Sequence, residues 1–187
     1  MLRESHENLS DPDFHIYEEM KKNNYSEAYS TNKIPASFSE HGYLLKEDVC
    51  ACLRAGKIKN IPYIAGCVMD DLGTTDEDRA KQQPGVLLDE CQEFCKEVQK
   101  ACGTKAYCYL FSRELPGEDG CSDTAFHSAE LWYMFGTLDR CWRPMKEYDY
   151  SLSREMITAW TNFMKTGESG AGWSPCSEAE DSFKIFR

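Results

Sequence analysis

The sequence has no long hydrophobic run and few basic residues. No stretch approaches the roughly 20 apolar residues that a membrane-spanning helix requires, and the first residues are polar, unlike a secretory signal peptide. We therefore expect a cytoplasmic protein that does not enter a membrane. Lysine and arginine number 21 against 32 aspartates and glutamates, a net charge of −11, which argues against nucleic acid or anionic lipid as a partner.

Metal-binding cysteine spacing is also missing, although the chain has ten cysteines. Zinc sites commonly use two Cys-x-x-Cys pairs, or one such pair with two histidines, and neither arrangement occurs here. Cys91, Cys95 and Cys102 instead share the apolar face of one predicted helix, and Cys67 and Cys108 fall in predicted buried strands. We interpret these thiols as small core side chains in a reducing compartment. We expect no cofactor and no metal, and a cysteine-rich metal protein is the least favoured alternative.

The chain is long enough for one domain and its hydrophobic core. We place this domain at residues 40–187, behind a polar N-terminal arm formed by residues 1–39. Spaced apolar residues between Phe14 and Met20 are compatible with either a short helix or a disordered segment in this arm.

Two short apolar runs separated by an amphipathic helix predict a βαβ unit. Residues 61–69 are nearly all apolar, as in a strand buried on both faces, and residues 106–111 form a second run rich in aromatic side chains. Between them, apolar residues recur at helical spacing over 86–102. Two strands joined by a helix are expected to lie parallel, so the fold class is α/β.

Shorter elements surround this unit. A capping box formed by Thr74 and Glu77 predicts the start of a helix after the first strand. The spacing of apolar residues predicts the remaining elements, which are helices over 47–55, 128–135 and 152–165 and a last strand over 183–186. The expected sheet therefore has few, mostly parallel strands with flanking helices.

Candidate catalytic side chains follow the two central strands. Asp70 and Asp71 end the first strand, and His127 follows the second strand after a loop. Because carboxyl ends of parallel strands share one edge, where α/β proteins place functional residues, these side chains are expected to meet. An aspartate that orients a histidine allows the imidazole to act as a general base. From these residues alone, a turn-capping aspartate and a structural histidine are also possible.

The segment around His127 resembles a known family. The sequence AFHSAELWYMFGTLDRCWRP (125–144) is similar to the catalytic-histidine segment of type-B carboxylesterases, a family that includes para-nitrobenzyl esterases and cholinesterases. In that segment the histidine is followed by a glutamate, an aromatic residue and a Phe-Gly pair, which are here Glu130, Tyr133, Phe135 and Gly136. Residues 150–167 resemble the closing helix of the family, and residues 60–73 resemble the strand and turn that carry the triad acid.

The resemblance implies the C-terminal part of an α/β-hydrolase fold with an incomplete sheet. It implies His127 as general base and Asp71 as triad acid, because Asp71 occupies the position of the family's glutamate. Asp70 remains the alternative acid. Glu130 is either a supporting carboxylate near His127 or a favourable charge in the first turn of a helix.

The nucleophile that the family requires is absent from this sequence. Neither its Gly-x-Ser-x-Gly turn nor its glycine-rich oxyanion loop occurs before the acid. Ser169 lies in Gly167-Glu168-Ser169-Gly170-Ala171, which lacks the last glycine and follows a predicted helix, so we interpret it as a loop residue. We therefore expect a serine-esterase fragment that is inactive alone and poorly stable, because its sheet edges are bare. In the complete enzyme, a separate N-terminal chain would carry the serine and the substrate would be a small-molecule carboxylic ester.

A non-catalytic interaction module derived from a carboxylesterase is the alternative function. Some cholinesterase-like adhesion proteins descend from such enzymes. The coding sequence upstream of Met1 distinguishes the two hypotheses, because an enzyme fragment requires a strand, a Gly-x-Ser-x-Gly turn and a helix there.

Overall fold

The computed structural model describes residues 49–170, 172–177 and 182–187, and Cys50–Arg187 form one compact unit. The predicted arm, with the short helix considered between Phe14 and Met20, lies outside the described residues. Among the helices of the described part, none combines the length and the apolar character needed to cross a membrane.

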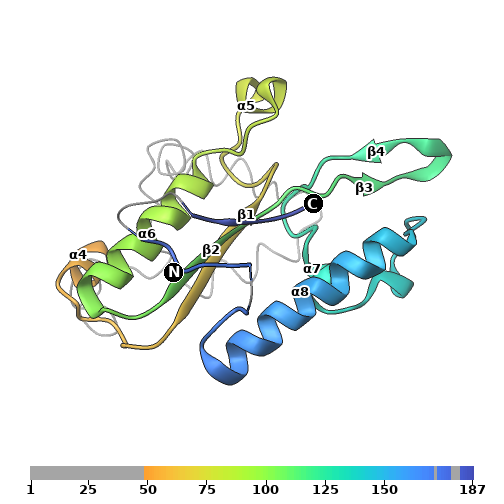
Figure 1. The fold of residues 1–187 in the computed structure, drawn as a ribbon. Coiled ribbons are helices and arrows are strands. Elements are labelled where there is room, and N and C mark those ends of the chain that lie inside the picture. Colours follow the sequence, from red (N-terminus) through yellow and green to blue (C-terminus); the bar gives the residue numbers. More distant parts are fainter. Residues whose placement is uncertain (1–48, 171, 178–181) are drawn as a thin grey trace, which may run out of the picture. The chain divides into compact units, whose positions relative to one another are not determined.

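A three-stranded parallel sheet forms the centre of this unit (Figure 1). The sheet contains β1 (Tyr63–Val68), β2 (Ala106–Phe111) and β5 (Lys184–Phe186), with β2 in the middle. All six residues of β2 are buried, as expected for a central strand between two layers. The α/β fold class and the parallel pairing of the two predicted strands are confirmed.

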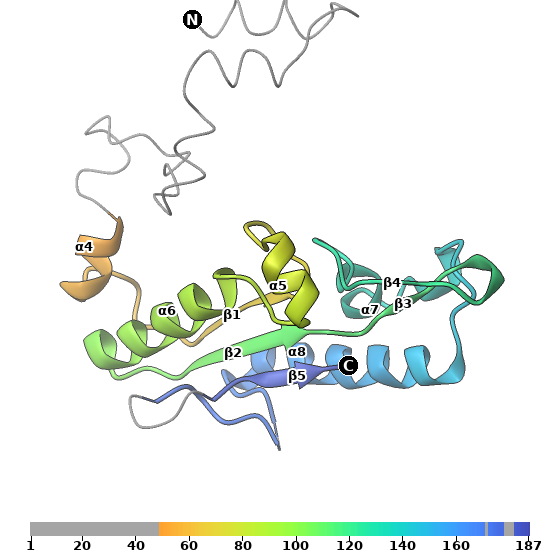
Figure 2. The same cartoon turned by 90° about the horizontal axis from the view of Figure 1, so that it is seen from above.

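Helices cover both faces of the sheet (Figure 2). The long helices are α6 (Leu87–Cys102), which packs on β1 and β2, and α8 (Glu147–Thr166), which lies on the opposite face. The short helices are α4 (Val49–Arg54), α5 (Asp76–Lys81) and α7 (Leu131–Met134). The loop after β2 contains a small antiparallel hairpin, formed by β3 (Leu115–Pro116) and β4 (Ser122–Asp123). Two 3₁₀ turns complete the fold, at Glu118–Gly120 and Leu138–Arg140.

Alternate side chains of the strands build two different hydrophobic cores. The core on the α8 side is largely aromatic and includes Tyr107, Tyr109, Phe111, Tyr133, Trp173 and Phe186. The core on the α6 side is built of smaller side chains and includes Cys67, Cys95, Val98, Cys108, Leu110 and Cys176. This two-residue alternation on both strands is what a sheet covered on both faces requires.

The cysteine interpretation agrees with this packing. All ten cysteines are free, and four of the thiols lie buried in the core between α6 and the sheet. Burial raises the pKa of the Cys91 thiol to about 11, so this thiol stays protonated and behaves as a weakly polar core group. Within the described ranges, no cluster of three or more histidine, cysteine, aspartate or glutamate side chains is placed to hold a metal ion.

The prediction that the first strand is buried on both faces is wrong for the first four of its six residues. Tyr63, Ile64, Ala65 and Gly66 are only half-buried. The reason is that β1 is an edge strand, with β2 as its one partner among the described residues.

The predicted capping box is displaced by one residue. The structure forms it between Thr75 and Asp78, because α5 begins at Asp76. Thr74 is instead buried, and Gly85 packs so closely on it that a Cβ atom there would lie 2.8 Å from the Thr74 Cα and Oγ1 atoms.

Candidate active site

The acid turn, residues 69–72 directly after β1, fixes the side chain of Asp71. Its Oδ2 atom accepts a hydrogen bond from the Val68 backbone N–H at 2.9 Å, and Oδ1 accepts one from the Leu72 N–H at 2.7 Å. The side chain is only 8% exposed. Two backbone donors therefore hold a shielded carboxylate in one orientation, at the carboxyl end of the strand.

The histidine segment, residues 124–128, returns to this turn after the β3–β4 hairpin. The Asp70 N–H donates to the Ala125 carbonyl at 2.9 Å, and Asp70 and Phe126 form a parallel bridge. Ser128, the residue after the histidine, has a positive φ of 73°, a backbone angle that residues other than glycine seldom adopt. α7 begins three residues later, so the histidine lies between an extended segment and a helix.

His127 and Asp71 meet at the carboxyl ends of β1 and β2. The His127 Nδ1 atom lies 2.6 Å from Asp71 Oδ1. Because a carboxylate oxygen only accepts, Nδ1 carries the proton and the neutral ring keeps its lone pair on Nε2. The His127 side chain is 58% exposed, so the ring is open to a further group. The structure thus brings together the two residues that the sequence suggests as base and acid.

Asp70, the alternative acid, has other partners. Its Oδ1 accepts from Arg79 Nε at 2.8 Å, and its Oδ2 accepts from the Thr124 hydroxyl at 3.0 Å. Both carboxylate oxygens are therefore engaged with groups other than the imidazole. The geometry favours Asp71 as the acid of the pair.

Glu130 adds a second carboxyl group near the pair. Burial raises its pKa, the negative charge of Asp71 raises it further, and His127 acts in the opposite direction. Its Oε2 atom is buried without a hydrogen-bond partner among the described residues, and its side chain makes no capping bond to α7. The charges of Asp71 and His127 therefore both act on the pKa of Glu130, in opposite directions.

A partly buried ion pair that the sequence did not reveal, between buried Asp149 and Arg113, anchors α7, the helix that follows His127. Asp149 Oδ1 accepts from the Tyr133 hydroxyl and from Arg113 Nε, each at 2.8 Å, and Oδ2 accepts from the Lys146 N–H at 2.9 Å. Burial opposes ionisation of Asp149, but these donors hold its pKa below the ordinary value. One aspartate near a helix start carries no sequence signal of a partner 36 residues away, so the network could not be predicted.

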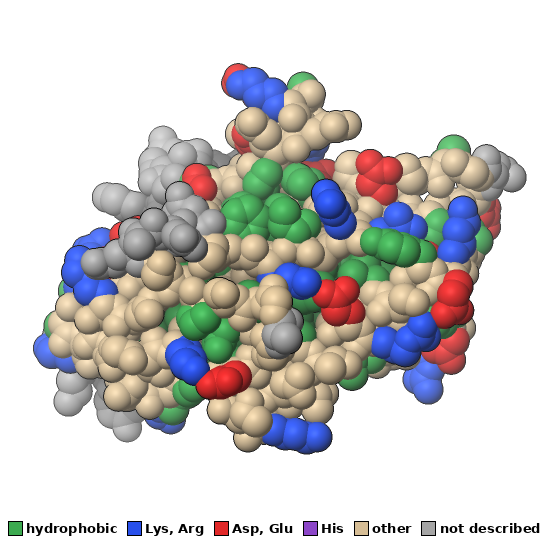
Figure 3. Space-filling model, in the orientation of Figure 1, with side chains coloured by type: hydrophobic (Ala, Val, Ile, Leu, Met, Phe, Trp, Pro, Cys, Tyr) green, Lys and Arg blue, Asp and Glu red, His purple; other side chains and the backbone are tan. Residues whose placement is uncertain are grey.

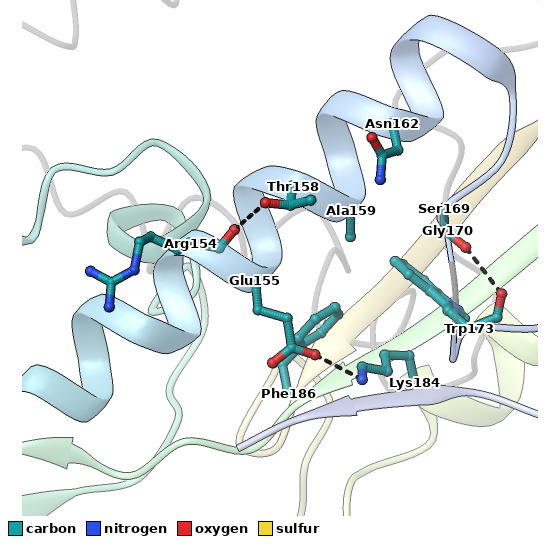
Figure 4. A pocket seen from close by; sticks show the side chains of 10 residues that line it. All are labelled: Arg154, Glu155, Thr158, Ala159, Asn162, Ser169, Gly170, Trp173, Lys184 and Phe186. Carbon is teal, nitrogen blue, oxygen red and sulfur yellow. Dashed lines mark hydrogen bonds and ion pairs between the residues drawn. The ribbon is translucent and has the colours of Figure 1, made fainter.

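Ser169 is packed into the loop that follows α8. It is buried, and its hydroxyl donates to the Trp173 carbonyl at 3.1 Å. It lines a cleft of about 310 Å³ between α8 and β5, beside the Glu155–Lys184 ion pair (Figure 4). Neither Asp71 nor His127 lines this cleft. The interpretation of Ser169 as a loop residue after a helix is confirmed.

Comparison with known proteins agrees with this geometry. The model of the carboxylesterase family matches residues 89–185, more than half of the chain and the part that contains His127. The chain belongs to the carboxylesterase family. None of the curated proteins matches it.

Two solved structures show the same fold. A PNB esterase aligns with a TM-score of 0.61 and 19% identity over 76% of this chain and 38% of its own. An esterase from Clostridium hathewayi, described as able to hydrolyze aliphatic aromatic polyesters, aligns with a TM-score of 0.51 and 23% identity over 61% and 23%. This carboxylesterase-family chain therefore spans well under half of either esterase, and its fold is a partial α/β-hydrolase fold.

Proposed function

We propose that this chain supplies the acid, Asp71, and the base, His127, of a serine esterase that acts on small-molecule carboxylic esters. The nucleophilic serine and the oxyanion donors come from a polypeptide segment outside these 187 residues. The 2.6 Å contact between His127 Nδ1 and Asp71 Oδ1 carries the proposal, and membership of the carboxylesterase family supports the reaction class.

In this mechanism the serine oxygen attacks the ester carbonyl while His127 Nε2 accepts the proton of the serine hydroxyl. Asp71 keeps the Nδ1 proton in place and stabilises the positive imidazolium that forms. The imidazolium then gives its proton to the departing alcohol, which leaves an acyl-serine. Water, deprotonated by His127, then attacks the acyl-serine, and the carboxylic acid and the free serine are released.

The open edge of β1 supports a location for the missing segment. The Tyr63 N–H donates to the Lys105 carbonyl just before β2, and the Met69 N–H donates to the Phe111 carbonyl at its end, so the intervening amides of Ile64 and Gly66 face the opposite way. β1 has no second strand partner among the described residues. A parallel strand added at this edge would end about 4.8 Å from the end of β1, beside Asp71. A serine at the end of that strand would lie close to the open face of the imidazole.

Exposed apolar surface near the acid turn agrees with this location. Leu72, next to Asp71, and Val86, whose Cγ1 would lie 3.5 Å from a Cβ atom added to Gly73, are both exposed. Figure 3 shows hydrophobic side chains gathered below α5. Contiguous apolar surface of this kind marks an interaction site more often than a solvated face. The chain alone should therefore bind a hydrophobic dye.

Two ester-hydrolysis assays test the proposal. The purified 187-residue chain is expected to hydrolyse p-nitrophenyl acetate no faster than its His127→Ala variant, because a base without a nucleophile leaves little rate enhancement. Turnover that disappears in His127→Ala would show that the chain is active alone.

The second assay supplies a serine. Residues 50–187 replace the matching part of the PNB esterase, and the chimera is expected to hydrolyse the same ester. His127→Ala and Asp71→Asn should each lower kcat by about 10³-fold or more, whereas the control Ser169→Ala should not. A folded chimera that is equally active with and without His127 would contradict the proposed base. A folded but inactive chimera would favour the interaction module.

A further inference from the structure

We propose that Asp70 is a positioning residue that clamps the histidine segment to the acid turn and so sets the contact between His127 and Asp71. The catalytic role of this clamp rests on the proposed function, in which His127 is the base. The clamp itself is a property of the fold and can be tested without ester hydrolysis.

Asp70 binds the histidine segment through both its backbone and its side chain. Its N–H donates to the Ala125 carbonyl at 2.9 Å, and its Oδ2 accepts from the Thr124 hydroxyl at 3.0 Å. The bridge with Phe126 extends this pairing to the residue that precedes His127. Because Asp71 follows Asp70 in the chain, each contact fixes the base relative to the acid.

The second carboxylate oxygen of Asp70 extends the clamp to α5. Arg79 Nε donates to Asp70 Oδ1 at 2.8 Å, and Arg79 also pairs with Asp76 at 2.8 Å. The Asp70 side chain is 19% exposed, so its charge is partly removed from water and benefits from a cationic partner. The guanidinium thereby offsets a negative charge that would otherwise add to that of Asp71.

The histidine segment needs such a clamp because packing alone fixes only part of it. Ala125 and Ala129, on either side of His127 in the chain, are buried and hold the backbone of the segment against the core. The ring itself is exposed, and the positive φ of Ser128 makes the adjoining backbone conformation unfavourable for a residue with a Cβ atom. The Asp70 N–H and carboxylate tie the start of this segment to the acid turn.

The tautomer of His127 reports the clamp directly. In the ¹⁵N-labelled 187-residue chain, NMR of the ring nitrogens under conditions where histidine is neutral should show mainly the Nδ1–H form, with His127→Ala identifying the signal. Asp70→Ala should lower the ratio of the Nδ1–H to the Nε2–H form by about tenfold, because the bond to Asp71 is no longer held in register. A purely structural role elsewhere would lower the melting temperature and leave this ratio unchanged.

Three further variants separate the contacts. Asp70→Asn keeps an acceptor for the Thr124 hydroxyl and should retain most of the wild-type ratio. Thr124→Val removes only that hydroxyl and should give an intermediate ratio, which keeps the test decisive even if Asp70→Ala does not fold. Asp76→Asn removes the other partner of Arg79 and should have no effect on the ratio.

A wild-type tautomer ratio in folded Asp70→Ala, or in Thr124→Val where the former does not fold, would overturn the clamp. That failure is distinct from failure of the proposed function. If the chimera is insensitive to His127→Ala while the tautomer ratio responds to Asp70, the clamp holds and only the catalytic assignment is wrong.

Discussion

The two halves of the candidate site are held in different ways. Asp71 is fixed by backbone amides at most three residues away, at Val68 and Leu72. The histidine segment instead depends on side chains distant in sequence, on Asp70 for its start and on Asp149 for the helix that follows it. A local turn survives as long as its strand does, whereas the histidine half should weaken each time a distant contact is lost.

Removal of Asp149 is the strongest test of this difference. Asp149→Ala leaves Arg113 and the Tyr133 hydroxyl without their buried acceptor and should lower the free energy of unfolding by about 4 kcal/mol. Urea unfolding of the full chain measures the loss. Tyr133→Phe, the matched control, removes one hydrogen bond from the same carboxylate and should cost only about 1 kcal/mol. Equal losses in the two variants would contradict the central role of Asp149.

The same variant predicts a pH dependence. The folded-state pKa of Asp149 lies below its ordinary value of 3.8, so folding stabilises the ionised form of this carboxyl group relative to the protonated form. Its contribution is fully present above pH 3.8 and is lost as the pH falls through the lower folded-state pKa. The stability difference between the wild type and Asp149→Ala should therefore be constant near neutral pH and shrink below pH 3.8. A difference that grows on acidification would contradict the ionised state assigned to this carboxylate.

The strand that carries the acid should be most sensitive where β1 touches the aromatic core. A Cβ atom on Gly66 would lie 2.2 Å from Cδ1 of Tyr109, so Gly66→Ala forces this ring to move. We expect a loss of about 2 kcal/mol in the free energy of unfolding, measured by urea denaturation. In a Tyr109→Leu background the added methyl group meets no ring, and the same alanine should cost less. Additive effects of the two substitutions would rule out this steric contact.

The sequence predicted best what is determined locally. Periodicity located β2 within 106–111 and α6 within 86–102, because these elements bury one consistent set of side chains. The pair Asp70-Asp71 could be located because it ends an apolar run, but the choice of Asp71 over Asp70 came from the family's glutamate position, and His127 was recognised mainly through a family motif. Its contact with Asp71 joins residues 56 positions apart and leaves no periodic trace.

What the sequence did not predict depends on pairing partners rather than on composition. The apolar run of β1 resembles that of a central strand, although β2 is its one described neighbour and its first four residues are half-buried. The clamp by Asp70 and the network around Asp149 were missed for the same reason, because each joins an aspartate to a partner far away in the chain, Thr124 for Asp70 and Arg113 for Asp149. Only coordinates show which of the 32 acidic residues are buried and paired.

The backbone beside His127 offers a smaller and opposite effect. Ser128 holds a φ of 73°, which a Cβ atom disfavours by about 1–2 kcal/mol, whereas glycine adopts it without strain. Glycine also gains about 0.5–1 kcal/mol of conformational entropy in the unfolded chain, so Ser128→Gly should stabilise the fold by only about 0.5 kcal/mol. Thermal unfolding measures the gain, and Ser128→Ala, which keeps the Cβ atom, should show none. A glycine variant less stable than the alanine variant would mean that contacts of the serine, and not backbone strain, govern this position in the histidine segment.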